Sequence, residues 1–329
     1  MSQLPEVLRR PLTVPVVASP MFIASGPRLV AAQCQAGVIG SFPALNARPT
    51  AQLADWLSEI TESNTAYAAA HPEASVAPFA VNQIVHKSND RLDADMAVIV
   101  EHRVPIVITS LGSRPEINEA VHSYGGIVLH DVVNDVHAHK AVDKGADGLI
   151  AVAAGAGGHA GTLSPFALVQ EIRRWFDGPL LLSGSIAHGR SILAALAAGA
   201  DLAYVGSAFL STEEVNVVDD YKQMIVDSTA NDIVYSNLFT GVHGNYLRGS
   251  IDAAGLDPDN LPTSDPTTMD FASDTLGETK AWRDIWGSGQ GIGAITERGT
   301  VAQLVSRLAD EFDTASRELV AQVTASAGA

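Results

Sequence analysis

Cysteine is nearly missing from this chain: among its 329 residues the only one is Cys34. A single thiol cannot form an internal disulfide or a cysteine-based zinc site, so a disulfide-stapled fold is excluded and a reducing compartment is expected. A lone cysteine inside an alanine-rich helical segment is more often part of the core than a nucleophile, and we interpret Cys34 in that way.

Positive charge is also scarce. The chain has 20 lysines and arginines against 37 aspartates and glutamates, which gives a net charge of −17. Binding to nucleic acid or to an anionic membrane needs a basic face, so neither partner is expected. A small anionic ligand is not excluded, because main-chain amides bind phosphate without any lysine.

Long hydrophobic runs are missing as well. The start of the chain has no apolar signal-peptide segment, and the most apolar later stretch, residues 191–210, is interrupted by Asp201 and by glycines. We therefore expect a cytoplasmic protein without a membrane span.

Aromatic residues make up only 6% of the chain although 47% of its residues are hydrophobic, so small and branched aliphatic side chains must fill the core. Such a core suits helices packed on a sheet. Eight short runs are continuously apolar, which is typical of parallel strands buried on both faces. Four begin at a proline and four follow a glycine that ends a helix-like stretch: Pro15, Pro78, Pro105 and Pro179, and Gly37, Gly125, Gly145 and Gly199.

These strand signals alternate with helix-like stretches over residues 1–210. Eight nearly even units predict an α/β fold of the (β/α)8 TIM-barrel type, with an open doubly wound sheet as the alternative. The alternation stops after residue 210, so residues 211–289 are predicted to form a small, mainly helical cap inserted after strand 8. Residues 290–329 contain an amphipathic helix that is predicted to return to the barrel domain.

The active site of such a barrel lies at the carboxyl ends of its strands. After the seventh and eighth predicted strands the chain enters glycine- and serine-containing loops that lead toward helices. The main-chain amides of Gly184, Ser185, Gly206 and Ser207 are predicted to bind a phosphate there.

The stretch VAAGAGGHAGTLSPF, residues 152–166, places glycines and alanines around one titratable side chain, His159. It follows the sixth predicted strand and contains few large side chains that could bury the histidine. Two interpretations are open: a structural histidine bonded to the backbone, or a base or polar anchor beside a planar ligand. Glycines favour the second, because they let a flat ring approach the backbone closely.

Three other patterns carry less weight. The GAGGHA segment fits the dinucleotide pattern G-x-G-x-x-A, but the next helix starts only near Ser164, too late for that fingerprint. The GSIAHGRS segment resembles a P-loop but has Arg190 where a lysine is required. His137 and His139 lie two apart on a predicted helix and point to different sides, so no metal site is predicted.

Several motifs occur together and in a fixed order along the chain: ASPM at residues 18–21, VN at 81–82, AGGHAG at 156–161, SGSIAHG at 183–189, VGSAFLSTEE at 205–214 and WGSGQGIG at 286–293. Over residues 14–293 this combination resembles the nitronate monooxygenases, formerly called 2-nitropropane dioxygenases.

The resemblance implies a TIM barrel that binds FMN, with His159 as the catalytic histidine. It implies that the FMN phosphate lies on the loops at residues 184–185 and 206–207, and that Gln290 reaches the flavin from the cap side. The cofactor-binding residues expected on this basis are Ala18, Pro20, Met21, Asn82, His130, Gly157, Gly158, Ser183, Gly184, Ser185, Gly206, Ser207 and Gln290.

The sequence also departs from the pattern of the family that it resembles. Gly155 stands where many members carry an acidic residue, and His130 and Asp131 stand near the end of strand 5, where many carry a lysine. No arginine follows the second phosphate loop. These departures bear on the substrate more than on flavin binding.

The activity that the resemblance implies is oxidation of an alkyl nitronate, such as propionate 3-nitronate, by FMN and O2 to a carbonyl compound and nitrite or related nitrogen oxides. A nitroalkane is an alternative form of the same substrate. Two other functions stay open: an FMN-dependent enoyl-thioester reductase that uses NAD(P)H, and a barrel that binds flavin or another phosphorylated ligand without turnover. A homodimer is also open, because large α/β barrels often pair.

Overall fold

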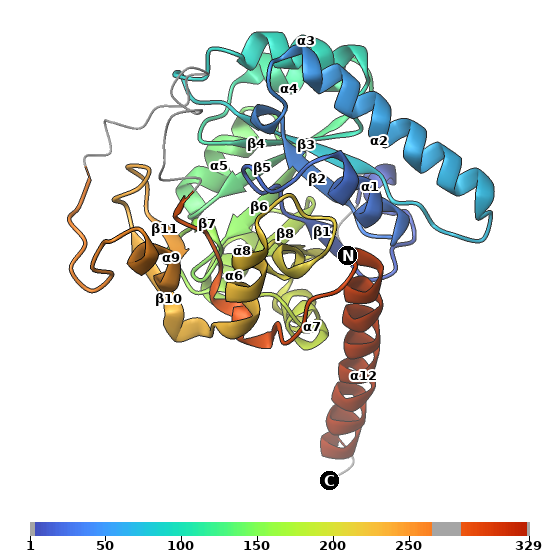
Figure 1. Cartoon of the computed structure of the whole chain (residues 1–329). Helices are drawn as coiled ribbons and strands as arrows, with labels where there is room; N and C mark the ends of the chain where they lie inside the picture. Colours follow the sequence, from blue (N-terminus) through green and yellow to red (C-terminus); the bar gives the residue numbers. More distant parts are fainter. Residues whose placement is uncertain (1–3, 265–283, 328–329) are drawn as a thin grey trace.

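The computed structural model describes residues 4–264 and 284–327. Eight parallel strands form one sheet in the order β1-β9-β8-β6-β5-β4-β3-β2. A parallel bridge between Val17 and Ile39 joins the first and last strands of that order, so the sheet closes into a barrel (Figure 1). The predicted TIM barrel is confirmed, and each strand falls on one of the predicted apolar runs. The strands are β1 (Val16–Ala18), β2 (Gly40–Pro43), β3 (Phe79–Ile84), β4 (Ile106–Ser110), β5 (Ile127–Val132), β6 (Gly148–Val152), β8 (Leu180–Ser183) and β9 (Leu202–Val205).

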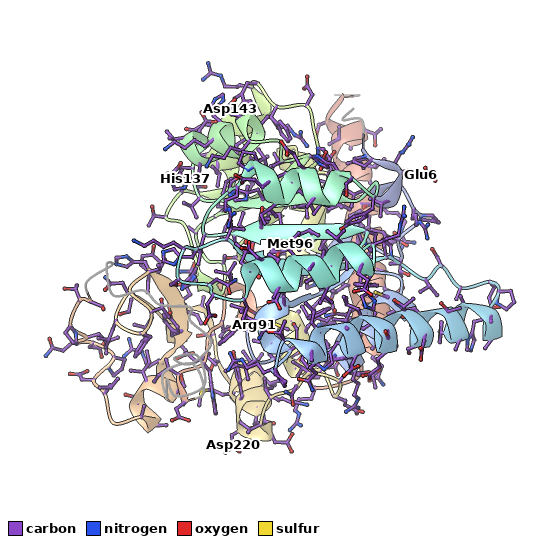
Figure 2. The ribbon with its side chains drawn as sticks, turned by 90° about the horizontal axis from the view of Figure 1, so that it is seen from above. Glu6, Arg91, Met96, His137, Asp143 and Asp220 are labelled. Atoms are coloured by element: carbon purple, nitrogen blue, oxygen red, sulfur yellow. The ribbon has the colours of Figure 1, made fainter. Side chains whose placement is uncertain are left out.

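Helices alternate with these strands and cover the outside of the barrel. One long helix, α2, is missing from the sequence-based prediction, although its buried residues Leu53, Leu57 and Ile60 recur at helical spacing. Figure 2 looks down on α3 and α4, which lie side by side, and shows α2 extending beyond the body of the barrel. The helices are α1 (Pro27–Gln35), α2 (Ala51–Ala70), α3 (Leu92–Glu101), α4 (Pro115–His122), α5 (Asp135–Asp143), α6 (Pro165–Arg173) and α7 (Gly189–Ala198).

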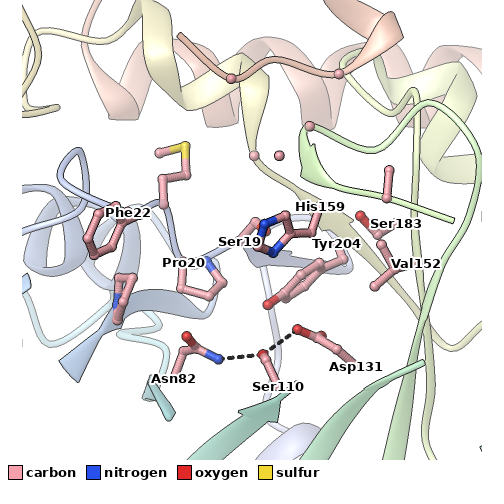
Figure 3. A pocket seen from close by; sticks show the side chains of 18 of the residues that line it. Ser19, Pro20, Phe22, Asn82, Ser110, Asp131, Val152, His159, Ser183 and Tyr204 are labelled. Carbon is pink, nitrogen blue, oxygen red and sulfur yellow. Dashed lines mark hydrogen bonds between the residues drawn. The ribbon is translucent and has the colours of Figure 1, made fainter. Parts of the chain in front are cut away.

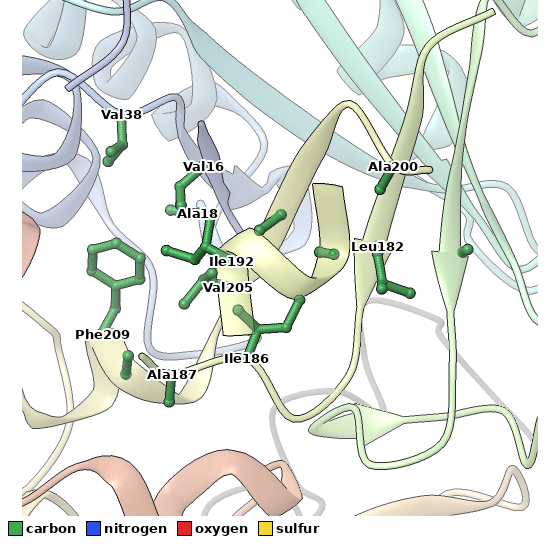
Figure 4. Packing of buried hydrophobic residues seen from close by; sticks show 14 of the residues in the cluster. Val16, Ala18, Val38, Leu182, Ile186, Ala187, Ile192, Ala200, Val205 and Phe209 are labelled. Carbon is green, nitrogen blue, oxygen red and sulfur yellow. The ribbon is translucent and has the colours of Figure 1, made fainter. Parts of the chain in front are cut away.

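The core has two layers, because successive strand residues face opposite sides of the sheet. Val17, Ile108 and Leu202 belong to the cluster inside the barrel. Their neighbours face the helices instead, and Figure 4 shows Val16, Ala18, Leu182 and Val205 packed with Ile192 of α7 and with Phe209. Burying each large aliphatic or aromatic side chain of this kind contributes about 1.5–3 kcal/mol, so packing holds the strand ends in place.

The segment after β9 adds a small antiparallel sheet to the mouth of the barrel. Strands β10 (Ile233–Ser236) and β11 (Gly244–Leu247) form a hairpin, and β11 pairs with β7 (Gly158–His159), which belongs to the loop after β6. The sequence pattern does not indicate this hairpin. The segment also contains η3 (Ser207–Ser211), α8 (Asp219–Asp227), η4 (Ala230–Asp232) and α9 (Arg248–Ala253).

Part of the predicted cap, residues 265–283, lies outside the described residues. The described structure resumes at residue 284, and the chain then passes over the barrel mouth again through η6 (Gln290–Ala294). The boundaries of the predicted cap, 211 and 289, stay a prediction.

The last helix, α12 (Val301–Ala327), packs on α7 and α1 and then extends away from the barrel (Figure 1). Its approach to α7 is close at Gly189, where an added Cβ would lie 2.2 Å from the main-chain nitrogen of Phe312. The Gly189 N–H donates to Glu311 Oε2 at 2.8 Å. No helix within the described ranges combines the length and the apolar composition that a membrane crossing requires.

Candidate active site

A cavity of about 900 Å³ opens at the carboxyl ends of the strands. This volume lies near the upper end for small-molecule and cofactor sites, so the cavity has room for a large ligand and a small one together. Its lining combines residues from the strand ends, from the loop after β6 and from the segment near residue 287.

His159 reaches this cavity because the loop after β6 turns back as a strand. Gly158 has φ +66, a left-handed conformation that favours glycine, and His159 then pairs with Gly244 of β11. The His159 Nε2 atom lies 2.9 Å from Thr240 Oγ1, and Thr240 Oγ1 donates its proton to the Val242 carbonyl at 2.9 Å. The Thr240 hydroxyl has one proton and two acceptors within reach, the Val242 carbonyl and His159 Nε2; when the proton is donated to the carbonyl, Nε2 is the donor to Thr240 and Nδ1 carries the lone pair of the neutral ring.

The charge state of His159 follows from its enclosure. Burial lowers the pKa of His159 from 6.5 to about 4, because a protonated imidazole loses hydration inside the site. The imidazole of the ligand-free protein is therefore neutral at pH 7 and is able to accept a proton.

Three polar side chains, Asn82, Ser110 and Asp131, lie below His159 in the cavity (Figure 3). Hydrogen bonds between them link three neighbouring strands. Asn82 of β3 donates to Ser110 Oγ of β4 at 2.7 Å and to the Ile108 carbonyl at 3.1 Å. Ser110 Oγ donates to Asp131 Oδ2 of β5 at 2.5 Å. Because both amide protons of Asn82 are donated inside the protein, its side chain offers a ligand only the acceptor Oδ1.

Asp131 is the acidic end of this chain of hydrogen bonds. Its Oδ1 atom is buried and has no hydrogen-bond partner among the described residues. Burial raises the pKa of Asp131 from 3.8 to about 6, and the hydrogen bond from Ser110 opposes that shift. A buried acceptor without a partner is costly, so Asp131 Oδ1 suits a ligand that brings its own donor.

Tyr204 of β9 lies next to Asp131 in Figure 3 and also lines the cavity. Burial raises the pKa of the Tyr204 phenol well above its usual value, and the nearby Asp131 carboxylate raises it further. Tyr204 is neutral across the physiological range, so it gives the site a neutral hydroxyl beside a carboxyl group.

His130 takes a different position from its neighbour in sequence. Its Nδ1 atom lies 2.6 Å from Thr109 Oγ1 on the adjacent strand. Burial, together with the nearby Lys144 and His137 side chains, lowers the pKa of His130 from 6.5 to about 4. His130 is therefore neutral at pH 7.

The loops after β8 and β9 form a group of main-chain donors, which we call the phosphate cradle and which comprises Gly184, Gly206 and Ser207. None of the main-chain hydrogen bonds found among the described residues uses the N–H groups of these three. The fourth predicted donor, the Ser185 N–H, is already donated to the Gly155 carbonyl at 3.2 Å. Three such amides at two loops are the arrangement that binds a phosphate group in many proteins.

Close backbone packing accounts for one glycine of the loop after β6 more directly than ligand access does. An added Cβ at Gly157 would lie 2.8 Å from the Gly289 nitrogen. Gly289 N in turn donates to Ser207 Oγ at 2.8 Å, so the segment at residue 289 connects the loop after β6 to the phosphate cradle. At Gly158, by contrast, no heavy atom lies within 4 Å of an added Cβ.

The structure brings most of the predicted site residues together. Two do not line the cavity: the Ala18 side chain is packed in the core, and Gln290 is exposed, with its N–H donated to the Gly155 carbonyl at 2.9 Å. The predicted residues that line the cavity are Pro20, Met21, Asn82, His130, Gly157, Gly158, His159, Ser183, Gly184, Ser185, Gly206 and Ser207.

A family model for nitronate monooxygenases matches residues 8–311. The chain belongs to the nitronate monooxygenase family. A nitronate monooxygenase of Paraburkholderia phytofirmans is 26% identical over 301 residues, which cover 79% of this chain and 80% of that protein. For three curated relatives the match covers 61%, 68% and 80% of the relative's length.

Solved structures agree with this assignment. The nitroalkane oxidase of Streptomyces ansochromogenes is 25% identical, with a TM-score of 0.78, and the match covers 94% of this chain and 98% of that one. FabK of Thermotoga maritima is also 25% identical, with a TM-score of 0.77 and coverage of 96% and 97%. As a member of the nitronate monooxygenase family with these neighbours, the chain is a flavin-dependent oxidoreductase, as predicted.

The residues present fit a flavin. The phosphate cradle offers donors to a phosphate, and an acceptor such as Asn82 Oδ1 or Asp131 Oδ1 suits the one N–H of an oxidised isoalloxazine ring. A flavin bound there would supply the electron-accepting chemistry, and the protein would supply position and electrostatics.

Ser110 ends one of the predicted apolar runs and is therefore expected at the active-site face, whereas two other residues of this nitronate monooxygenase family site are not indicated by the sequence. Tyr204 lies on β9 at a position that faces the barrel interior, so alternation from Leu202 is the signal that could find it. Thr240 lies 81 residues beyond His159 in the chain, and no local pattern connects the two.

Proposed function

We propose that this chain binds FMN and oxidises alkyl nitronates with O2, giving a carbonyl compound and nitrite or related nitrogen oxides. FMN rather than FAD is favoured because the main-chain N–H groups of the phosphate cradle come from only two loops, which follow the neighbouring strands β8 and β9, and this suits one phosphate group. A nitronate such as propionate 3-nitronate is the substrate class that family membership favours.

The observation that carries this proposal is a neutral histidine held over an enclosed cavity. His159 is oriented by Thr240, and one nitrogen of its neutral ring carries a lone pair. From a neutral nitroalkane, that nitrogen accepts the α-proton and leaves the nitronate. From a ready-made nitronate no proton has to be removed, and the ring serves as a polar contact for the anion.

The replacement His159→Asn separates these two roles. Asparagine keeps a polar group but cannot act as a base near pH 7, so the rate with a nitroalkane is expected to fall about 10²–10⁴-fold. The rate with the matching nitronate is expected to fall much less. Oxygen uptake and nitrite release, measured with FMN-loaded protein, report both rates, and unchanged rates with both substrates would exclude His159 from the chemistry.

The second candidate is an FMN-dependent enoyl-thioester reductase that uses NAD(P)H. It is favoured by one observation, the likeness to FabK over nearly the whole of both chains. Rapid loss of the oxidised-flavin absorbance on adding NADPH without O2 would support the reductase, and a rate far below that with a nitronate would support the oxidation proposed above.

A further inference from the structure

The cavity has an apolar wall on the side formed by the first four strands. Four side chains pack together there as a separate hydrophobic cluster and also line the cavity: Phe22, Leu45, Ile84 and Leu111. They stand at or shortly after the carboxyl ends of β1, β2, β3 and β4, and Leu45 belongs to η2 (Ala44–Asn46). We call this cluster the apolar wall. Figure 3 shows Phe22 across the cavity from Ser183, the residue of β8 that leads to the phosphate cradle.

Two large apolar residues on this side keep a backbone conformation that their side chains disfavour. Leu111 has φ +59, and Ile23, which follows Phe22, has φ +65; both lie in the left-handed region. A Cβ atom makes this conformation unfavourable, most of all for a β-branched residue, whereas glycine and asparagine adopt it more readily. The backbone therefore gives no reason for leucine and isoleucine at these positions. Both residues line the cavity, which points to contact with a ligand as the role of their side chains.

One side chain, Asn46, fixes the loop after β1 that carries Phe22 and Ile23. Asn46 Nδ2 donates to the carbonyls of Met21 and Ser25 at 3.0 and 2.8 Å. Asn46 Oδ1 accepts the Ile23 N–H at 2.9 Å. Because the loop is bound at three points within the protein, it keeps its shape without a ligand, and binding does not have to order it.

The apolar lining continues from this wall to the open rim of the cavity. The Asn216 N–H donates to the Ala24 carbonyl at 3.0 Å, and Asn216 Nδ2 donates to the Ile23 carbonyl at 3.4 Å. The segment after η3 therefore lies beside the loop after β1. Val218 of that segment is 61% exposed and Ile23 is 39% exposed, and both line the cavity. Large apolar side chains at an exposed rim mark a binding path for an apolar group.

Charge is missing from this part of the lining. Among the described residues that line the cavity, the aspartate, the histidines and the lysines all come from β5 or from later in the chain. The loops after β1, β2, β3 and β4 and residues 216–218 contribute only apolar and neutral polar residues. An uncharged hydrocarbon is the chemistry that such a surface binds, since every methylene group that leaves water favours binding.

We propose that the apolar wall binds the hydrocarbon chain of the substrate and that this chain leaves the cavity between Ile23 and Val218. The inference rests on the proposed function, because it places the nitronate group of the same molecule beside His159. It narrows the substrate from alkyl nitronates in general to those with a long, uncharged chain. Propionate 3-nitronate, which is short and ends in a carboxylate, is then a poor substrate.

A chain-length series of primary nitronates, from ethyl to octyl, tests this with the FMN-loaded protein. Full burial of one methylene group favours binding about fourfold, so kcat/KM is expected to rise about two- to fourfold with each added carbon. The rise is expected to end where the chain emerges past Ile23 and Val218. Butyl 1-nitronate is expected to react faster than propionate 3-nitronate. A rate that does not depend on chain length, or a preference for propionate 3-nitronate, overturns the inference.

Asparagine replacements make use of the left-handed backbone. Leu111→Asn and Ile23→Asn put a polar side chain on this surface at positions whose backbone conformation suits asparagine, so both variants are expected to fold. Each is expected to lower the ratio of kcat/KM for octyl nitronate to that for ethyl nitronate about tenfold. The matched control is Arg103→Asn, because Arg103 also has a left-handed backbone, with φ +49, but is exposed and does not line the cavity. A ratio that stays at the wild-type value in both Leu111→Asn and Ile23→Asn excludes the apolar wall from substrate binding.

Binding without turnover separates this inference from the proposed function. Octanamide has a planar polar head and a hydrocarbon chain but is not a nitronate, and calorimetry measures its affinity for the FMN-loaded protein. If no nitronate is oxidised, the proposed function fails, yet the wild type must still bind octanamide more tightly than Leu111→Asn does. Equal affinities overturn the inference.

The affinity for FMN separates the substrate chain from the flavin as the occupant of the wall. The phosphate cradle lies at β8 and β9, on other strands than the wall, so Leu111→Asn and Ile23→Asn are expected to bind FMN as tightly as the wild type. Fluorescence titration measures the three dissociation constants. Weaker FMN binding by both variants would show that the wall contacts the flavin, and this result also overturns the inference.

Discussion

At the scale of single residues, the site depends on how one imidazole is oriented. Thr240 Oγ1 lies 2.9 Å from His159 Nε2 and 2.9 Å from the Val242 carbonyl oxygen, so the hydroxyl joins the ring to the main chain. The segment after β9 thereby orients the ring. Such partners of catalytic histidines fix both the tautomer and the ring orientation.

We expect Thr240→Val to lower kcat for a nitroalkane about tenfold with little change in KM, because one hydrogen bond of about 1 kcal/mol no longer orients the ring. Thr240→Ser keeps the hydroxyl and should restore most of the rate. Steady-state kinetics of the two variants decide the point. Equal losses in both would show that Thr240 acts through packing and not through its hydroxyl.

The buried carboxyl group of Asp131 lowers the free energy of unfolding at neutral pH. The carboxyl group loses its proton near pH 3.8 in the unfolded chain and near pH 6 in the folded protein. Between these values the folded protein binds more protons, so the free energy of unfolding falls as pH rises and stays lower above pH 6.

The variant Asp131→Asn has no carboxyl group that titrates at this position, so its free energy of unfolding does not fall in this pH range. The amide oxygen of the new side chain can still accept the hydrogen bond from Ser110. We expect it to raise the free energy of unfolding of the flavin-free protein at pH 8 by roughly 2 kcal/mol. At pH 4 the variant and the wild type should be nearly equal. Denaturant melts at the two pH values provide the test, and an equal change at both pH values would contradict the assigned pKa.

At the scale of structural elements, two segments far apart in the chain build the mouth of the cavity. The loop after β6 pairs with β11 through Gly158 and His159, and it packs against residues 287–289. The second contact leaves no space for a side chain at Gly157. The phosphate cradle lies next to it, joined by the bond from Gly289 to Ser207.

Two alanine replacements in this junction form a matched pair. Gly157→Ala would place a Cβ 2.8 Å from the Gly289 nitrogen, whereas at Gly287 the nearest atom lies 3.6 Å away, an ordinary contact. We expect Gly157→Ala to weaken FMN binding about tenfold or more through a shifted backbone, and Gly287→Ala to change it little. Fluorescence titration with FMN measures both, and equal affinities would contradict the packing argument.

The elements also differ in how far the sequence predicts them. The eight strands are indicated because short, continuously apolar runs bounded by proline or glycine are typical of buried parallel strands and too short for buried helices. Helix α2 has only one narrow buried stripe, with Leu53, Leu57 and Ile60, and its other residues are not buried. The hairpin of β10 and β11 contains no continuously apolar run, because Tyr235 of β10 is exposed and β11 begins with Gly244 and Asn245.

At the scale of the whole molecule, the closed barrel is the reason that the site motifs could be assembled from sequence. Carboxyl ends of parallel strands all meet at one face, so residues such as Asn82 and Ser183, on strands at opposite sides of the barrel, line the same cavity without any local signal. The features that the sequence does not predict are those that depend on the segment after β9. That segment supplies Thr240, and it meets the barrel through side-chain and backbone contacts that have no periodicity.

Nitronate oxidation is tested most directly by following the flavin itself. FMN-loaded protein is mixed without O2 with propyl 1-nitronate, and the visible absorbance of the oxidised flavin is recorded. We expect the absorbance to fall within the time of one turnover and to return when air is admitted, because the substrate passes electrons to the flavin and O2 then removes them. An absorbance that stays constant with the nitronate would contradict nitronate oxidation as the activity of this chain.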